Sequence, residues 1–275
     1  MDHKEKIPCT VYIMTLNAGP DFCRCLESVK DYGEILVTDG NSTDGTQDMA
    51  REYGAKVIKQ SDSDEPNIPI TDFAAVQNRC LQEAKFDWIF QLDMDESMTP
   101  EINEEIRQIV TQPTQYWGYY VPKKIVYKGR IIKYYNGSEG LEMKFCNRTS
   151  GAVMKRSPHH RLEFDTQKYP VSSLKNSYLA YFTIPPYNEG KNYPKRFLDM
   201  EIKEVRKQNL TQFIYWTLII RSLKTLKKIW KIFVLYARHG FKETFPPEIE
   251  FARVQYSLLI ILGSLRERIF GNYIP

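Results

Sequence analysis

Residues 35–46 read ILVTDGNSTDGT, and this stretch decides the fold class of the chain. Its first four residues are aliphatic or β-branched and are typical of a short buried strand, which Asp39 and Gly40 bring to an end. The small and polar residues that follow lead into a predicted helix over 46–53, which Gly54 ends. A strand that passes through a tight turn into a helix is the repeating unit of a parallel α/β sheet.

The same alternation of strand and helix patterns extends through the first hundred residues. We expect strands over 10–16, 34–38, 55–60 and 88–92, and helices over 22–29, 46–53, 72–84 and 100–110. Helices of this length between short strands predict a doubly wound, mostly parallel sheet with flanking helices. In such sheets the ligand crevice lies beyond the carboxyl ends of the strands.

The pattern changes beyond the first hundred residues. Short β-like segments are expected to extend the sheet and shape an acceptor pocket; they cover 119–122, 125–127, 131–135, 142–146 and 178–183. Helical patterns with little strand character follow from residue 195. We therefore expect a catalytic domain over 1–205 and a helical C-terminal region over 206–275.

Composition excludes several classes of protein. The 275 residues are 42% hydrophobic and 26% charged, which excludes wholesale disorder, and a net charge of +4 is too small to indicate nucleic acid as a partner. The five cysteines are odd in number and form no CxxC pair, so we expect neither a disulfide scaffold nor a zinc site. We therefore expect the protein to work in a reducing compartment. The charged N-terminus and the absence of any apolar run of about 18 residues predict a cytoplasmic protein without a leader or a spanning helix.

Acidic residues follow two of the predicted strands. Asp39 ends the strand over 34–38, and Asp93 and Asp95 come directly after the strand over 88–92. Because the carboxyl ends of parallel strands meet at one edge, both clusters should face the same crevice. A carboxylate at the position of Asp39 could accept a hydrogen bond from the imide N–H of uracil or from ribose hydroxyls. The alternative is a structural joint between strand and helix, capped by Asp44 and Thr43.

The sequence Asp93-Met94-Asp95 is suited to a nucleoside diphosphate held with a divalent cation. Hard cations such as Mg²⁺ or Mn²⁺ bind carboxylate and phosphate oxygens, and one carboxylate of the pair can bind the metal while the other holds ribose or sugar. An isolated Asp-x-Asp is a weak signal because acidic turns are common. Here it follows Asp39 by about fifty residues, with a helix and a turn pattern between them, which strengthens the prediction.

The chain resembles the inverting glycosyltransferases of the GT-A fold, family 2, and in particular the branch that contains lipopolysaccharide-core and surface-glycan transferases. The matching segments are 15–17, 25–29, 39–46, 73–78 and 87–96. The resemblance implies a nucleotide-sugar donor, with Asp39 on the base, Asp93 on the ribose or sugar, and Asp95 on the metal. It also implies metal-dependent transfer with inversion from a UDP-sugar to the hydroxyl of a glycan or lipid-linked glycan.

Three sets of candidate site residues follow from these patterns. The candidate contacts to the nucleotide sugar are Thr15, Asn17, Asp39, Asn41, Asp44, Asn78 and Asp93. Asp95 and Asp93 are the candidate ligands for Mn²⁺ or Mg²⁺. The candidate catalytic residues are His159, His160 and Glu163.

The catalytic base is the least defined part of the site. An inverting transfer needs a group that takes the proton of the acceptor hydroxyl, and Asp165 could also do this chemically. The resembling branch tends to carry a His-Glu pair, whereas here His159 is followed by His160. Both histidines could equally be ordinary loop residues. Nearby basic residues could neutralise the departing diphosphate or form a solvated face; they are Arg148, Lys155, Arg156 and Arg161.

Residues 213–238 have the pattern of an amphipathic helix with a basic face. Between Arg221 and Lys242 there are seven Lys or Arg residues and no Asp or Glu. Such a helix could lie on an anionic membrane at its cytoplasmic face, or it could pack on the catalytic domain with its basic side in water.

Two other functions compete with a glycosyltransferase. A sugar nucleotidyltransferase would have a Gly-rich, basic phosphate loop near the first strand, and the segment TLNAGP at 15–20 has neither a second glycine nor a lysine. A non-catalytic subunit that binds nucleotide sugars fits the missing Glu beside His159.

Overall fold

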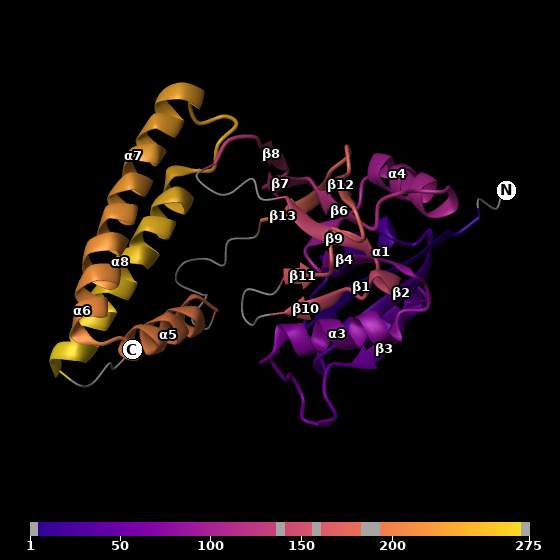
Figure 1. The fold of residues 1–275 in the computed structure, drawn as a ribbon, viewed down its shortest axis with the longest axis horizontal. Coiled ribbons are helices and arrows are strands. Elements are labelled where there is room, and N and C mark those ends of the chain that lie inside the picture. Colours follow the sequence, from indigo (N-terminus) through magenta and orange to yellow (C-terminus); the bar gives the residue numbers. More distant parts are fainter. Residues whose placement is uncertain (1–4, 136–140, 156–160, 183–192, 271–275) are drawn as a thin grey trace. The chain divides into compact units, whose positions relative to one another are not determined.

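The computed structural model describes residues 5–135, 141–155, 161–182 and 193–270 (Figure 1). The chain divides into two compact units, the first formed by residues 1–124 and 139–181 and the second by residues 125–138 and 182–275. The domain boundary at residue 205 that the sequence indicates stays a prediction.

The first unit contains a seven-stranded sheet with the order β12-β6-β9-β4-β1-β2-β3. Its strands are β1 (Ile7–Thr15), β2 (Tyr32–Asp39), β3 (Lys56–Lys59), β4 (Trp88–Asp93), β6 (Gly118–Val121), β9 (Glu142–Asn147) and β12 (Val171–Ser173). Strands β4, β1, β2 and β3 run parallel, whereas β9 lies antiparallel between β4 and β6. The predicted α/β fold with a mostly parallel sheet is confirmed.

Helices connect the parallel strands and cover both faces of the sheet, as the alternating pattern predicts. They are α1 (Phe22–Ser28), α2 (Thr46–Glu52), α3 (Phe73–Glu83) and α4 (Pro100–Thr111). Val11 and Ile13 of β1 point into the main core together with residues of α1, α2 and α4, while Tyr12 points to the other face, where it packs with α3. This alternation follows from the period of two along a strand.

Shorter strands complete the first unit. Strand β10 (Val153–Lys155) pairs antiparallel with β11 (Arg161–Glu163), and β5 (Glu96–Ser97) pairs antiparallel with β13 (Tyr178–Tyr181). The sequence predicted the segments of β6, β9 and β13 and their role in extending sheet structure, but it did not indicate β5, β10, β11 or β12. These four strands have only two or three residues each, too few for a periodic pattern.

The second unit is mostly helical. It contains α5 (Tyr193–Arg206), α6 (Leu210–Gln212), a π-helical segment η2 (Phe213–Ile220), α7 (Arg221–His239) and α8 (Pro247–Phe270). It also contains the turn between β7 (Lys123–Tyr127) and β8 (Arg130–Ile132). Within this unit α8 packs against both α5 and α7. Among the described residues, no helix is both long enough and apolar enough to cross a membrane.

Candidate active site

The two acidic clusters lie at one edge of the central sheet. In the parallel register, Thr15 of β1 pairs with Asp39 of β2, and the preceding residue, Met14, pairs with Asp93 of β4. The carboxyl ends of three adjacent parallel strands therefore place Thr15, Asp39 and Asp93 at one edge of the sheet, where the sequence predicts the acidic residues. Because successive residues of a strand alternate between faces, Asp39 and Asp93 leave this edge on opposite sides of the sheet. That both acidic clusters face one crevice therefore stays a prediction.

Asp39 is buried and accepts four hydrogen bonds. Its Oδ2 accepts from Oγ1 of Thr15 at 2.7 Å and Oγ of Ser42 at 2.6 Å. Its Oδ1 accepts from the backbone N–H of Ser42 at 2.7 Å and Nε2 of Gln47 at 2.8 Å. Only 1% of Asp39 is exposed, so its carboxylate fixes the turn after β2 in this conformation. The role on a nucleotide base that the resemblance implies stays a prediction.

Asn17 and Asp44 join the two turns that follow β1 and β2. Asn17 accepts the N–H of Thr43 at 3.1 Å. Asp44 accepts the N–H of Gly19 at 3.1 Å and the N–H of Thr46, the first residue of α2, also at 3.1 Å. Hydrogen bonding from the Thr46 side chain lowers the pKa of Asp44. The N-cap position of α2 is taken by Gly45, so Asp44 and Thr43 are not its caps. Asp44 instead joins the two turns into one hydrogen-bonded edge, and its predicted contact with a nucleotide sugar stays a prediction.

Gly40 and Asn41 attach the loop over 61–70 to this edge. Asn41 adopts a left-handed backbone with φ of 58°, and its Nδ2 donates to the carbonyls of Ser63 at 2.9 Å and Glu65 at 2.8 Å. The carbonyl of Ile68 lies so close to Gly40 that a Cβ there would come within 2.4 Å of it. A glycine is needed at this point because the two backbones touch.

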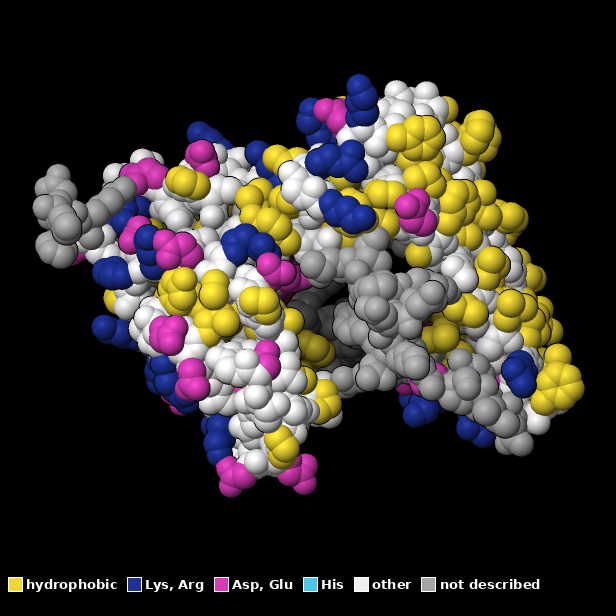
Figure 2. All heavy atoms as spheres, turned by 180° about the vertical axis from the view of Figure 1, so that it is seen from behind, with side chains coloured by type: hydrophobic (Ala, Val, Ile, Leu, Met, Phe, Trp, Pro, Cys, Tyr) yellow, Lys and Arg dark blue, Asp and Glu magenta, His cyan; other side chains and the backbone are white. Residues whose placement is uncertain are grey.

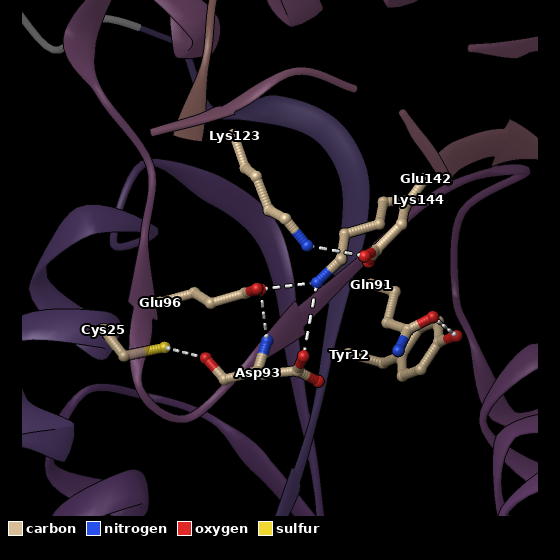
Figure 3. A network of polar contacts seen from close by, with 8 residues as sticks. All are labelled: Tyr12, Cys25, Gln91, Asp93, Glu96, Lys123, Glu142 and Lys144. Atoms are coloured by element: carbon tan, nitrogen blue, oxygen red, sulfur yellow. Dashed lines mark hydrogen bonds and ion pairs between the residues drawn. The ribbon is translucent and has the colours of Figure 1, made fainter. Parts of the chain in front are cut away.

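A buried group of charges lies beside Asp93 at the end of β4 (Figure 3). We call it the Asp93 corner; it consists of Asp93, Glu96 and Lys144. Nζ of Lys144, on β9, lies 2.6 Å from Oε2 of Glu96 and 3.3 Å from Oδ2 of Asp93. Glu96 also accepts the backbone N–H of Asp93 at 3.0 Å, and the ring of Tyr178 lies 4.8 Å from the ammonium. The side chains of Lys144 and Glu96 are 3% and 7% exposed, whereas that of Asp93 is 46% exposed.

The ammonium of Lys144 thus interacts with two carboxylates, those of Glu96 and Asp93. Burial raises the pKa of Glu96 to about 7, although the charge of Lys144 opposes this effect. Burial acts to lower the pKa of Lys144, but the charges of Asp93 and Glu96 outweigh it and raise that pKa well above its usual value. Lys144 therefore stays charged and keeps Asp93 oriented at the sheet edge.

Asp95 is exposed beside this group. Partial desolvation and the charge of Asp93 raise its pKa, and the charges of Lys144 and Arg24 oppose this rise. Two neighbouring carboxylates at a sheet edge are hard oxygen donors with an excess of negative charge, so Asp93 and Asp95 fit a divalent cation such as Mn²⁺ or Mg²⁺. The described residues contain no preformed group of three or more acidic, His or Cys ligands. Phosphate oxygens or water would have to complete the coordination.

Asn78 is engaged with the backbone of β10. Its Nδ2 donates to the carbonyl of Met154 at 3.0 Å, and its Oδ1 accepts the N–H of Met154 at 2.8 Å. The amide therefore attaches α3 to β10, the strand that precedes the predicted catalytic histidines in the sequence. A contact between Asn78 and a nucleotide sugar stays a prediction.

The predicted base is only partly visible in the structure. His159 and His160 lie outside the described residues. Glu163, on β11, pairs with Lys155 at 3.3 Å, and both side chains are partly exposed. The carboxylate of Asp165 accepts backbone N–H groups of the turn that follows it. The choice of catalytic base among these residues stays a prediction.

Of the basic residues near this hairpin, Arg148 has a structural role. Its Nε donates to the carbonyl of Phe86 at 3.1 Å and its Nη1 to that of Leu81 at 3.5 Å, so it binds backbone in the last turn of α3 and just beyond its end. Arg156 lies outside the described residues.

Sequence reasoning missed Lys144 and Glu96. The signal available was weak, because Lys144 is one charged residue within the apolar run MKFC at 143–146 of a predicted strand. A cation inside a buried strand indicates an acidic partner. The identity of that partner depends on the pairing of β9 with β4, which are far apart in the chain.

A cavity of about 830 Å³ in the first unit lies elsewhere. It is lined by α4 and by residues that include Tyr116, Tyr119 and Asn176, and none of the predicted site residues lines it. We therefore locate the candidate site by the acidic edge of the sheet and not by this cavity.

The mostly parallel sheet, with two acidic turns at its carboxyl edge, belongs to the GT-A class of α/β folds. A solved mannosyltransferase from Pyrobaculum calidifontis, in complex with GDP-mannose and Mn²⁺, superposes with a TM-score of 0.52 over 96% of this chain and 89% of its own, at 12% identity. The family model for glycosyl transferase family 2 matches residues 10–118. Over this segment, which we call the family 2 segment, the chain is similar to the family 2 glycosyltransferases, which confirms the resemblance inferred from the sequence.

Relatives with curated descriptions agree with this family. An uncharacterized glycosyltransferase of Rickettsia prowazekii is 29% identical over 44% of this chain and 39% of its own length. A lipopolysaccharide core biosynthesis glycosyltransferase of Rhizobium meliloti is 24% identical over 43% of each chain. The chain thus spans less than half of the length of these relatives.

Proposed function

We propose that this protein is a metal-dependent inverting glycosyltransferase that transfers a hexose or related sugar from a UDP-sugar to the hydroxyl of a glycan or lipid-linked glycan. The observation that carries the proposal is the meeting of Asp39 and Asp93 at one carboxyl edge of the parallel sheet, inside the family 2 segment. Ligands of such sheets bind at this edge.

The two sides of the edge suit two parts of the donor. The turn that Asp39 organises consists of small and polar residues close to exposed backbone, which suits a base and ribose. Asp93 and Asp95 lie on the side suited to the diphosphate and would hold the divalent cation between them. When bound, such a cation stabilises the charge that develops on the leaving diphosphate. The mannosyltransferase from P. calidifontis was solved with a nucleotide sugar and Mn²⁺, which supports this assignment.

The proposed reaction is a single in-line displacement. The acceptor oxygen forms a bond to the anomeric carbon while the bond from that carbon to the diphosphate oxygen breaks, and UDP leaves with the electron pair. The acceptor proton passes to a base on this chain, for which His159, His160 and Glu163 are the candidates. Lys144 acts as a positioning residue because it orients Asp93 and does not itself reach the open edge.

The proposed acceptor class is supported by one of the relatives. The R. meliloti relative is described as a lipopolysaccharide core transferase, which supports a role in bacterial surface-glycan or polysaccharide biosynthesis. UDP-sugars are made in the cytoplasm, and we propose that the protein acts there.

The donor and metal assignments are tested by a thermal shift titration of the full chain with UDP, with and without Mn²⁺. We expect UDP to raise the Tm only in the presence of Mn²⁺ and Asp95→Asn to abolish this rise. Asp31→Asn is the matched control, since Asp31 is an exposed carboxylate at the opposite end of β2. If Asp95→Asn keeps the full Mn²⁺-dependent shift, the metal assignment is wrong.

Release of UDP from UDP-sugars without acceptor tests catalysis separately, because a catalytically competent site slowly transfers the sugar to water. UDP binding without any such release would favour the alternative of a nucleotide-sugar-binding subunit. No UDP binding under any ionic condition would refute the proposed function.

A further inference from the structure

An exposed row of large apolar side chains runs along η2 and α7. We call it the apolar stripe; it consists of Ile219, Leu223, Leu226, Trp230 and Phe233, each between 48% and 66% exposed. The spacing of four and three residues places them on one face of the helix. The buried residues of α7, Thr225 and Ile232, lie on a different face, so packing within the second unit does not account for the stripe.

A second row, which we call the basic stripe, lies beside the first. It consists of Lys224, Lys227, Lys231 and Arg238, all exposed. At about 100° per residue it is displaced from the apolar stripe by roughly a third of a turn. Residues 221–242 contain no acidic residue that could neutralise it.

The neighbouring helix α8 adds to the exposed apolar surface. Phe251, Leu258, Leu262 and Ile269 are between 44% and 67% exposed and recur at helical spacing. Helix α8 packs against α7, and Nζ of Lys228 donates to Oγ of Ser257 at 3.2 Å across their contact. Hydrophobic side chains extend along the face of the second unit shown in Figure 2. A soluble surface rarely leaves so many large apolar residues exposed without a partner.

Charge decides which partner fits. A second copy of the chain joined through the apolar stripes would bring two basic stripes close together with no acidic residues between them. A bilayer surface with anionic headgroups accepts both stripes, because the apolar side chains enter the acyl boundary and the cations meet the headgroups. Aromatic residues such as Trp216 and Trp230 are common at this depth of a membrane.

A shallow hollow lies where the two stripes meet. It has a volume of about 290 Å³, and its lining includes Trp230, Lys231 and Arg238. Two cations beside an aromatic ring, with no carboxylate among the lining residues, form a site that suits the phosphate and glycerol of a lipid headgroup.

We infer that the surface formed by η2, α7 and the exposed side of α8 is a docking surface for anionic membranes. The helices lie in the plane of the interface, since none of the described helices can cross it. This inference does not rest on the proposed reaction, and its test needs neither donor nor metal.

The test is co-sedimentation of the full chain with vesicles of phosphatidylcholine alone or of phosphatidylcholine mixed with phosphatidylglycerol. We expect binding to the mixed vesicles only, a decrease with added NaCl, and a blue shift of tryptophan emission on binding. Absence of binding to the mixed vesicles, or equal binding to both kinds, would overturn the inference.

Two sets of substitutions separate the contributions of the stripes. Trp230→Ser combined with Phe233→Ser should weaken the partition coefficient about 100-fold, because each exposed aromatic contributes roughly tenfold when buried. Replacing the three lysines of the basic stripe by glutamine should weaken it by a similar factor, at about fivefold per lysine. All five side chains are exposed, so the Tm should stay within about 1 °C of the unmodified protein.

The matched control replaces three exposed lysines outside the surface, Lys85, Lys168 and Lys175, by glutamine. The control should bind as the unmodified protein does. If it binds as weakly as the basic-stripe variant, the attraction is only a net-charge effect and the docking surface is wrong. If the Trp230 and Phe233 changes leave vesicle binding intact but abolish a concentration-dependent dimer, the occupant is a second copy and the inference is overturned.

Discussion

Replacement of Lys144 by methionine removes the one cation that serves Asp93 and Glu96. Methionine keeps a long unbranched side chain, so the change deletes mainly the charge. Nζ lies 2.6 Å from Glu96 in a position that is 3% exposed, and water cannot replace it. Loss of one partner from a buried pair costs about 3–5 kcal/mol of unfolding free energy, because the other charge is left uncompensated. Asp93 is half exposed and adds little to this cost.

The loss of unfolding free energy caused by Lys144→Met should depend on pH. Burial raises the pKa of Glu96 from an ordinary 4.5 to about 7 in the folded state. Between these values the folded state binds more protons than the unfolded state, so the unfolding free energy falls as pH rises. Without Lys144 the pKa of Glu96 in the folded state rises further. In acid Glu96 is then protonated, so that the buried side chain carries no charge. We expect the loss from Lys144→Met to be largest at about pH 8 and less than half as large at about pH 5.5.

Urea unfolding followed by circular dichroism at both pH values, in the presence of EDTA, measures this loss. The matched control is the double variant Lys144→Met with Glu96→Gln, in which no buried charge is left unpaired. Relative to Glu96→Gln alone, it should lose only about 1 kcal/mol. A loss below about 1 kcal/mol for Lys144→Met at the higher pH, or an equal loss at both pH values, would show that the three charges do not form the buried group described above.

Three further predictions concern the turns and the hairpin near the site. Gly40→Ala should lower the unfolding free energy by about 2–3 kcal/mol in urea titrations, because its Cβ would lie 2.4 Å from the carbonyl of Ile68; an unchanged midpoint would contradict this contact. Asn78→Ala leaves the N–H and carbonyl of Met154 without their partner and should lower the unfolding free energy by about 2 kcal/mol in the same assay. A loss of UDP affinity with no loss of stability would instead support a direct contact between Asn78 and the donor. Asp44→Ala removes the carboxylate that accepts the N–H groups of Gly19 and Thr46 and should cost about 1 kcal/mol at neutral pH. Since hydrogen bonding lowers the pKa of Asp44, this difference should disappear as pH falls through that lowered pKa, and a difference that persists in acid would argue against these hydrogen bonds.

The strands and helices of the first hundred residues could be predicted because their patterns are local. The aliphatic run that ends at Asp39 and the turn after it indicate β2 and the start of α2 without reference to any other part of the chain. The position of Asp93 and Asp39 at the same edge of the sheet also followed from sequence, since parallel strands align their carboxyl ends.

The partners of these residues could not be predicted, because they come from pairings between distant segments. Lys144 reaches Asp93 only because β9 lies antiparallel beside β4, and nothing in either segment specifies that register. Asn78 has the side chain of a ligand-binding residue, yet its amide is bound to Met154 across 76 positions of the chain. The burial of Asp39 under Ser42 and Gln47 likewise depends on how the turn folds back.

The position of β9 has a consequence for the limits of the family 2 segment. That segment ends at residue 118, whereas β9 begins at Glu142, so the cation that neutralises the Asp93 corner comes from outside it. A fragment cut after residue 118 would expose the edge of β4 and retain two acidic side chains without their counter-charge, which favours aggregation over folding. Chimeras that graft residues 10–118 onto another transferase would therefore need a host strand that brings its own lysine or arginine to the same place.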